Sequence, residues 1–503
     1  MIRGKATVEG TKKYSERFSN HRFRELGKTG LQVSQVGFGS YRIDPTIHNH
    51  HFALQQSLLN GVNLIDTSSN YGDGGSEQLI GRVLAQTALG GAVNREEIVV
   101  VSKTGYLQGS NYTMSQQRKA EGQAWPELVE HSPNLEHCIH PDFIADQLTR
   151  SLERLELDHI DVYLLHNPEY YLGWAKGRNA PINIVRDVYY DRIRRAFLHL
   201  EQEVENGRIG CYGVSSNTFV VDPEDAQFTE LKRIYDIACS IRPDHHFRVV
   251  QMPMNLIETD AATVSNQPTG ESVLDYARSK GLGVLINRPL NAVIGKTLTR
   301  LADAPQFESA TIAEVEDALN DVIRLENVFR QQIMPMLPHS PQVLSRLGQY
   351  VTAGQMLQGK WFTLGTYHQW EQMVTSYLLP RLNAARDFLS KPGNLPADDI
   401  DWLSAYIEAV NVVFREIGGV FGDMAEKKEM QLRAVVESAE PAWLSNTLSQ
   451  TAIRALRSTS GVTSVLVGMR KPDYVTDVLA DSPSGNGQAS YQEAWQKLSK
   501  VKM

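Results

Sequence analysis

The fold of this chain is decided by four short stretches, Leu64-Ile65-Asp66-Thr67-Ser68-Ser69-Asn70-Tyr71-Gly72, Val99-Val100-Val101-Ser102-Lys103, Asp161-Val162-Tyr163-Leu164-Leu165-His166 and Tyr212-Gly213-Val214-Ser215-Ser216-Asn217. Each contains an apolar run of the length typical of a strand buried on both faces. The first three runs end at titratable residues, and the fourth ends at hydroxyls and an amide. Because the carboxyl ends of barrel strands share one mouth, we expect Asp66, Tyr71, Lys103 and His166 to converge there.

Strand and helix patterns alternate along the chain around these stretches. Candidate strands lie at 36–39, 63–66, 98–103, 160–166, 209–215, 249–252 and 283–286, and helical patterns separate them. The eighth strand pattern is found only at 461–468. This alternation predicts an α/β fold, a (β/α)8 TIM barrel of parallel strands. The residues from 23 to 33 predict a small hairpin that closes the bottom of the barrel.

A large α-helical insertion is predicted between strands 7 and 8. The expected domains are a barrel at 22–303 plus 447–481, an insertion at 304–446, and terminal extensions at 1–21 and 482–503. We expect four or five helices packed as a bundle, with Gly418-Gly419 interrupting the pattern that begins at Trp402. A loop that leaves strand 7 emerges on the catalytic face of a barrel, so the insertion is expected to limit access to the mouth.

Composition excludes several function classes. The 503 residues carry a formal net charge of −8, which argues against a nucleic-acid partner. No apolar run approaches the roughly 20 residues that span a bilayer, so no membrane partner is expected. The three isolated cysteines fit neither a disulfide framework nor a zinc site, and the histidine clusters lack the accompanying ligands of a metal site. We therefore expect a cytoplasmic protein without a bound metal.

The four converging side chains favour carbonyl chemistry. Taken singly, each has a plainer interpretation as a turn cap, a core residue or a rim residue. Together they can activate a tyrosine, because a nearby Lys103 ammonium is expected to lower the pKa of the Tyr71 phenol. Asp66 would keep Lys103 charged, and His166 would orient a substrate oxygen. No side chain supplies a hydride, so the chemistry implies a nicotinamide or flavin.

The same residues resemble the aldo-keto reductase family. Members carry an Asp-(x4)-Tyr-Gly stretch after strand two, a Lys ending strand three and a His ending strand four, as do Asp66, Tyr71, Lys103 and His166. The opening at 23–33 and Gly37-Phe38-Gly39-Ser40 are also similar, and the resemblance covers about 22–303 and 447–481. It implies interconversion of a carbonyl and an alcohol, with Tyr71 as general acid or base.

The resemblance also implies a set of cofactor-binding residues. Ser215 or Ser216, with Asn217 and Gln251, would hold the nicotinamide carboxamide, with the serine register open by one residue. Two departures are present: Asn287 stands where the family usually has a stacking aromatic residue, and Asp477-Val478 replaces a Glu-Asn pair. The whole expected set is Gly39, Ser40, Asp66, Ser215, Ser216, Asn217, Gln251, Asn287, Arg288, Leu290, Gly468, Arg470, Lys471 and Asp477.

Cofactor choice depends on the stretch Gly468-Met469-Arg470-Lys471-Pro472, which is similar to the family's phosphate loop. Two cations there can meet a 2′-phosphate, which favours NADP(H) while NAD(H) stays possible. A solvated pair at a helix start is the competing interpretation.

The leading hypothesis is an NADP(H)-dependent oxidoreductase that acts on a small carbonyl or alcohol. The alternative is a redox-responsive regulatory or protein-interaction module that binds the cofactor with little turnover. Several aromatic residues in carboxyl-face loops line a substrate pocket or pack those loops against the barrel: Tyr106, Tyr112, Trp125, Tyr170, Tyr171 and Trp174.

Overall fold

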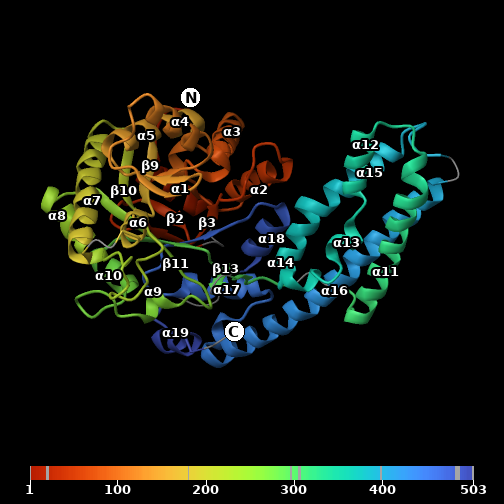
Figure 1. Ribbon diagram of the computed structural model, residues 1–503. Coiled ribbons are helices and arrows are strands. Elements are labelled where there is room, and N and C mark those ends of the chain that lie inside the picture. The colour runs from red at the N-terminus through yellow and green to blue at the C-terminus, as the bar shows by residue number, and fades with distance from the viewer. Residues whose placement is uncertain are drawn as a thin grey trace. The chain divides into compact units, whose positions relative to one another are not determined.

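The computed structural model describes residues 2–18, 22–178, 181–294, 297–303, 307–396, 399–481 and 488–500. The chain divides into two compact units, Met1–Leu301 with Val435–Met503, and Ala302–Ala434. Figure 1 shows both units and labels many of their helices and strands. In the described part of the chain, no helix combines the length and the apolar content that crossing a bilayer requires.

The first unit contains a closed barrel of parallel strands. In chain order these are β3 (Val36–Gly39), β4 (Leu64–Asp66), β5 (Val99–Thr104), β9 (Ile160–His166), β10 (Ile209–Ser215), β11 (Phe247–Pro253), β12 (Gly283–Asn287) and β15 (Ser464–Val467). Their spatial order, β10-β11-β12-β15-β3-β4-β5-β9, is that of a (β/α)8 barrel. The barrel predicted from the sequence is confirmed.

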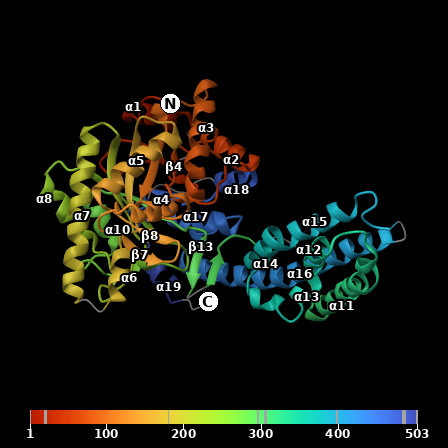
Figure 2. The ribbon, with the colours of Figure 1, turned by 45° about the horizontal axis from the view of Figure 1, so that its top comes forward.

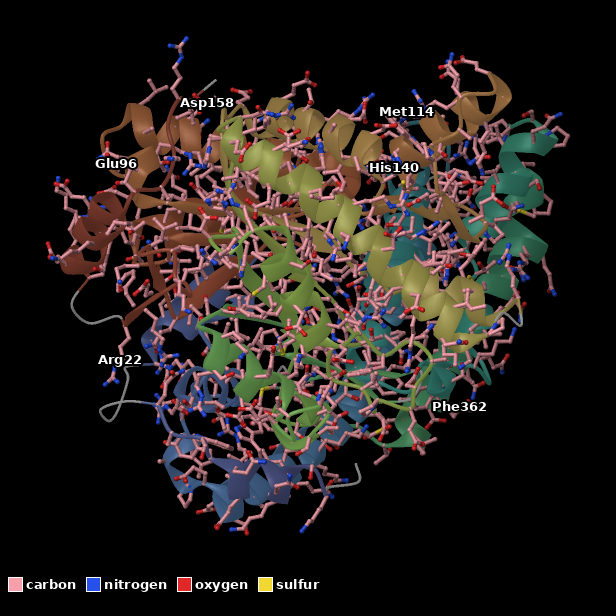
Figure 3. The ribbon with its side chains drawn as sticks, turned by 90° about the vertical axis from the view of Figure 1, so that its left-hand side faces the viewer. Arg22, Glu96, Met114, His140, Asp158 and Phe362 are labelled. Atoms are coloured by element: carbon pink, nitrogen blue, oxygen red, sulfur yellow. The ribbon has the colours of Figure 1, made fainter. Side chains whose placement is uncertain are left out.

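Helices cover the outside of this barrel because each buries one apolar stripe against the strands. They are α2 (His48–Leu59), α3 (Gly75–Leu89), α5 (Pro141–Leu155), α7 (Ile182–Glu205), α8 (Leu231–Ile241), α10 (Val273–Lys280), α17 (Leu448–Ser458) and α18 (Pro472–Ala480). Figure 3 shows the long α7 crossing the outer surface. Inside the barrel, small and medium apolar side chains fill the core, among them Leu64, Val101, Leu164, Val249 and Leu285.

The amino ends of the barrel strands are closed by the start of the chain. Strands β1 (Phe23–Glu25) and β2 (Gln32–Ser34) form the predicted antiparallel hairpin. Helix α1 (Val8–Arg17) precedes it, and Thr7 caps this helix by accepting a hydrogen bond from Gly10 N–H. The C-terminal α19 (Gln492–Leu498) and the short α9 (Asp260–Thr263) also belong to this unit.

Structured loops follow the carboxyl ends of several strands. After β5 come β6 (Tyr106–Leu107), α4 (Gly109–Ala120), β7 (Val129–Ser132) and β8 (Leu135–His137), and β6, β8 and β7 make a small sheet. After β9 comes α6 (Tyr170–Lys176), and after β12 the hairpin β13 (Asn291–Ile294) and β14 (Thr297–Arg300). Figure 2 labels three of these loop strands, β7, β8 and β13.

The second unit is helical. Its helices are α11 (Ile312–Val328), α12 (Pro341–Tyr350), α13 (Ala353–Leu357), α14 (Tyr367–Met373), α15 (Leu379–Leu389) and most of α16 (Ile400–Ala439). The predicted capping box is present at Thr311 and Glu314. Because short helices such as α13 and α14 are present, the described part of the unit contains more helices than the four or five that were expected.

One expectation for this unit is wrong, because α16 continues through Gly418-Gly419 without interruption. A Cβ at Gly419 would lie 2.4 Å from the Glu308 carbonyl oxygen and 3.0 Å from Ala310 Cβ. The missing side chain therefore serves close packing against residues 308–310, and tertiary contact outweighs the low helix propensity of glycine.

Candidate active site

Four predicted side chains meet at the carboxyl end of the barrel. Asp66 ends β4, Lys103 is the penultimate residue of β5, and His166 ends β9. Tyr71 begins a short 3₁₀ turn at Tyr71–Gly74, in which residues 72, 73 and 74 all have positive φ angles of 57°, 53° and 85°. Glycine at the first and third of these positions makes this left-handed bend accessible, so the chain turns directly from Tyr71 into α3.

Lys103 is the centre of the group, and its side chain is fully buried. Its Nζ donates to Asp66 Oδ2 at 2.7 Å, to the Thr67 carbonyl oxygen at 2.8 Å and to the Tyr71 hydroxyl at 3.3 Å. These contacts use all three ammonium hydrogens. A buried cation is tolerated here because a carboxylate pairs with it and every donor finds an acceptor.

Asp66 also connects the group to the opposite side of the barrel. Its Oδ1 accepts a hydrogen bond from Gln251 Nε2 at 2.7 Å. Gln251 Oε1 in turn accepts from Ser215 Oγ at 3.0 Å and, more weakly, from Asn287 Nδ2 at 3.5 Å. The carboxylate therefore orients the amide of Gln251, which lies among several residues expected to contact a cofactor.

His166 lies beside Tyr71, with ring centroids 5.9 Å apart in an edge-to-face arrangement. Its Nδ1 is 3.0 Å from the Ser68 hydroxyl, and among the described residues its Nε2 makes no hydrogen bond. Burial, with the nearby positive charge of Lys103, holds the pKa of His166 well below its ordinary value. The imidazole is therefore neutral at pH 7.

The electrostatics of Tyr71 differ from the prediction. Burial raises the pKa of Tyr71 well above 10, and the Asp66 carboxylate adds to the rise. The expectation that Lys103 lowers this pKa is therefore wrong for the site as it stands. Asp66 lies 2.7 Å from the ammonium and offsets its charge, so little net attraction for a phenolate remains. Burial likewise raises the pKa of Asp66 and lowers that of Lys103.

The expected carboxamide-binding residues lie together. Ser215 ends β10 and bonds to Gln251 on the neighbouring β11, and the buried Ser216 donates its N–H to the Gln251 carbonyl oxygen at 3.0 Å. Asn217 follows directly. Asn287 ends β12, and its buried Oδ1 has no hydrogen-bond partner among the described residues. The unpaired Asn287 Oδ1 can accept from the amide nitrogen of a nicotinamide carboxamide, and the nearby hydroxyl and amide groups can rearrange to meet its carbonyl oxygen.

Other expected cofactor residues occupy the rim. The Ser40 hydroxyl donates to the Asp66 carbonyl oxygen at 2.7 Å, and Gly39 packs against β15. Arg288 pairs with Glu258 at 2.8 Å. The carbonyl oxygen of Leu290 accepts the Leu301 N–H.

The last expected set follows β15. Gly468 and Lys471 are exposed, and Arg470 is close enough to help lower the pKa of His50, although burial is the main cause. Asp477 differs, because its carboxylate accepts hydrogen bonds from Thr447 Oγ1 and Gln450 Nε2, each at 3.0 Å, in the first turn of α17. Asp477 is thereby engaged in joining two helices.

Sequence reasoning did not single out several residues of the site. Ser68 contacts His166 and lies inside the first quoted stretch, so its position was the available signal. Of the aromatic residues that the sequence did single out, Tyr106 packs edge-on to His166 at 4.7 Å, whereas Trp125 packs in a loop core with Leu107, Cys138 and Phe143. Glu169 is 5% exposed and had no local signal.

Comparison with known proteins matches residues 37–333 to the aldo/keto reductase family, more than half of the chain. The chain belongs to this family. Aldo-keto reductase YhdN of Bacillus subtilis is 22% identical over 270 residues, which cover 52% of this chain and 60% of that protein. L-galactose dehydrogenase of Arabidopsis thaliana is 26% identical over 276 residues, covering 53% and 65%. The chain thus spans less than two thirds of the length of these relatives.

Among solved structures, an aldo-keto reductase from Bacillus halodurans is similar to this member of the family. Its TM-score is 0.47 at 16% identity, and the alignment covers 95% of this chain and 97% of that one.

Proposed function

We propose that this protein is an NADP(H)-dependent oxidoreductase that interconverts an aldehyde or ketone and the corresponding alcohol by hydride transfer. The observation that carries the proposal is Lys103, whose Nζ contacts both Asp66 Oδ2 and the Tyr71 hydroxyl at the carboxyl end of the barrel. Membership of the aldo/keto reductase family supports the same class of reaction. A bound nicotinamide supplies the hydride in reduction and accepts it in oxidation.

Tyr71 is the proposed general acid in reduction. Its raised pKa keeps the hydroxyl protonated at neutral pH, so a proton is available for the substrate oxygen. An alkoxide is a stronger base than a phenolate, so the transfer to it is downhill even from this weakly acidic phenol. The phenolate that remains keeps the hydrogen bond from Lys103 Nζ, although Asp66 offsets most of the attraction of the ammonium charge.

His166 is the proposed orienting group. This role requires the Ser68 hydroxyl to turn its one hydrogen from Asn70 Oδ1, 2.7 Å away, to His166 Nδ1. The hydrogen of the neutral ring then resides on Nε2, which can donate it to the substrate oxygen. Two donors, Tyr71 and His166, fix that oxygen as negative charge develops on it.

The cofactor would be held along the strand ends. Ser215, Ser216, Asn217, Gln251 and Asn287 offer amide and hydroxyl groups to the carboxamide. Gly39, Ser40, Asp66, Arg288, Leu290, Gly468 and Asp477 would form the rest of the site. Arg470 and Lys471 offer two positive charges to a 2′-phosphate, which supports NADP(H) over NAD(H).

The helical unit is proposed to be an insertion between strands 7 and 8 of the barrel. Strands β12 and β15 pair directly, with Leu285 opposite Ser464, although the residues of the unit lie between them in sequence. The restriction of access to the mouth by this unit stays a prediction.

The test of the function is oxidation of NADPH with a panel of aldehydes, ketones and quinones. Tyr71→Phe removes the proton donor and keeps the ring, so we expect kcat to fall by about 10²–10⁴-fold. Tyr235→Phe, on the outer helix α8, is the matched control and should leave kcat unchanged. If the protein binds NADPH, reduces nothing in the panel and is unaffected by Tyr71→Phe, the enzyme proposal fails and the cofactor-binding module replaces it.

A further inference from the structure

A buried carboxyl group lies directly behind the proposed carboxamide site. Glu169 follows His166 by three residues, in the segment between β9 and α6, and is 5% exposed. This burial is unusual, because a glutamate is almost never fully buried without a charged partner. Among the described residues no cation pairs with it.

The contacts of Glu169 are directed at the loop after β10. Its Oε1 accepts a hydrogen bond from the Asn217 N–H at 2.8 Å. Its Oε2 is buried and makes no hydrogen bond of good geometry in the described part of the chain. The Asn167 N–H donates to the Ser215 carbonyl oxygen at 2.7 Å, so backbone and side chain both tie the β9 loop to the β10 loop.

A chain of hydroxyl groups supports the same loop. The Ser216 hydroxyl lies 3.2 Å from that of Thr218, which is 2.8 Å from that of Thr229. The Thr229 hydroxyl is 3.0 Å from the hydroxyl of Tyr189 on α7. The loop is therefore held by an ordered polar network, and Glu169 is the member of it that can change charge near neutral pH.

The charge state of Glu169 follows from its surroundings. Burial raises the pKa of Glu169 to about 7, and the hydrogen bond from Asn217 opposes this rise only in part. The titratable groups that face it, Tyr106 and Tyr189, are themselves buried, and burial raises the pKa of each well above its ordinary value. Both tyrosines are thus neutral, and the charge at this position depends on Glu169 alone.

We propose that Glu169 is a positioning residue that fixes the backbone of Asn217, and so places Ser216 and Asn217 for contact with the nicotinamide carboxamide. The inference rests on the proposed function, because it needs the cofactor to bind at the strand ends. Glu169 acts through the loop: it accepts from the part-buried Asn217 N–H, which would otherwise lose its acceptor in the protein.

The test measures NADPH binding by fluorescence titration, without turnover. Glu169→Ala removes the acceptor of the Asn217 N–H, so we expect the Kd for NADPH to rise about ten-fold. Glu169→Gln keeps an acceptor oxygen at Oε1 and should restore the Kd to within about three-fold of wild type. Thermal melts establish that each variant is folded. An unchanged Kd in folded Glu169→Ala would overturn the inference.

A second readout separates positioning from a merely structural role. Above pH 7 Glu169 becomes a carboxylate, which favours the cationic ring of NADP⁺ over the neutral ring of NADPH. Between pH 6 and pH 8 the ratio Kd(NADPH)/Kd(NADP⁺) should rise by about three-fold or more. The 2′-phosphate titrates equally in both forms, so it cancels from the ratio. In Glu169→Gln the ratio should stay flat.

Glu201→Gln is the matched control, because Glu201 is equally buried but bonds to Tyr212 and His246 at the other end of β10 and β11. It should keep the pH dependence of wild type. A ratio that changes equally in wild type and in Glu169→Gln would overturn the inference. If wild type binds no NADPH at all, the proposed function fails instead, so the two failures are distinguishable.

Discussion

Two buried ion pairs lie at opposite ends of the same barrel, and they differ in what completes them. At the amino ends of the strands Arg95 pairs with Asp161 at 2.9 Å, with side chains 5% and 2% exposed. At the carboxyl ends Lys103 pairs with Asp66 at 2.7 Å, with side chains 0% and 5% exposed. By burial and distance the two pairs are almost the same.

The amino-end pair is completed by backbone. Asp161 Oδ1 accepts the Ala6 N–H at 2.7 Å, and Oδ2 accepts the Val100 N–H at 2.8 Å. Arg95 donates to the carbonyl oxygens of Ile98 and His159. These partners cannot change protonation state, so this pair fixes the start of the chain and the strand ends in place.

The carboxyl-end pair is completed by a phenol. Lys103 donates to the hydroxyl of the partly exposed Tyr71, and Asp66 accepts from the side chain of Gln251. As an acceptor for the cation, a group that can release a proton thus replaces a backbone carbonyl oxygen. The comparison teaches that a buried ion pair becomes chemically useful through its third partner, while the pair itself has the same geometry in both roles.

The largest expected effect is on the free energy of unfolding, when the ion pair at the amino ends of the strands is broken. Arg95→Met leaves Asp161 buried without its cation, so the free energy of unfolding should fall by about 3–5 kcal/mol in urea denaturation. The kcat should stay within about two-fold of wild type, a small change on the scale of general acid catalysis. Arg150→Met, which breaks the exposed pair with Asp146, is the control and should cost only about 0.3–0.5 kcal/mol. If Arg95→Met lowered kcat without lowering the free energy of unfolding, the two ion pairs would not differ in role as described.

The next effect is the pH dependence of the reaction rate. Of the two pairs, only the carboxyl-end pair contacts a group, Tyr71, whose protonation should change that rate. Alcohol oxidation needs the phenolate, and the raised pKa of Tyr71 makes it scarce at neutral pH. Below that pKa the phenolate fraction increases with pH, so initial rates of oxidation should rise about ten-fold per pH unit between about pH 7 and pH 9. Carbonyl reduction uses the protonated form and should stay nearly flat. An oxidation rate that levels off by pH 8 would contradict the raised pKa.

The smallest effect tests the rim of the carboxyl end. Arg470→Ala removes a partly exposed charge from the proposed 2′-phosphate site, so the KM for NADPH should rise about ten-fold and that for NADH should not change. Urea denaturation should show unchanged stability, unlike Arg95→Met. Arg82→Ala, at an exposed position on α3, is the control and should alter neither KM. Equal weakening of both cofactors would mean that Arg470 does not contact the 2′-phosphate.

The sequence alone predicts the barrel and the carboxyl ends of several of its strands, such as Asp66 in β4 and His166 in β9. Apolar runs such as Val99–Val101 predict buried strands wherever they occur, and their last residues share a mouth for geometric reasons. That is why the sequence by itself predicts that Asp66, Lys103 and His166 lie close together. Periodicity was a weaker guide in the helical unit, where Gly419 sits inside α16 because a neighbouring backbone approaches it closely.

Only the tertiary structure decided the charge states and the supporting contacts. The pKa of Tyr71 depends on burial and on how far Asp66 offsets Lys103, and both are sums over the whole surroundings. Gln251 reaches Asp66 across 185 residues of chain, and Glu169 reaches the Asn217 N–H across 48. Local sequence encodes a strand because its pattern is local, but a proton's affinity for an oxygen is set by every group that folding brings near it.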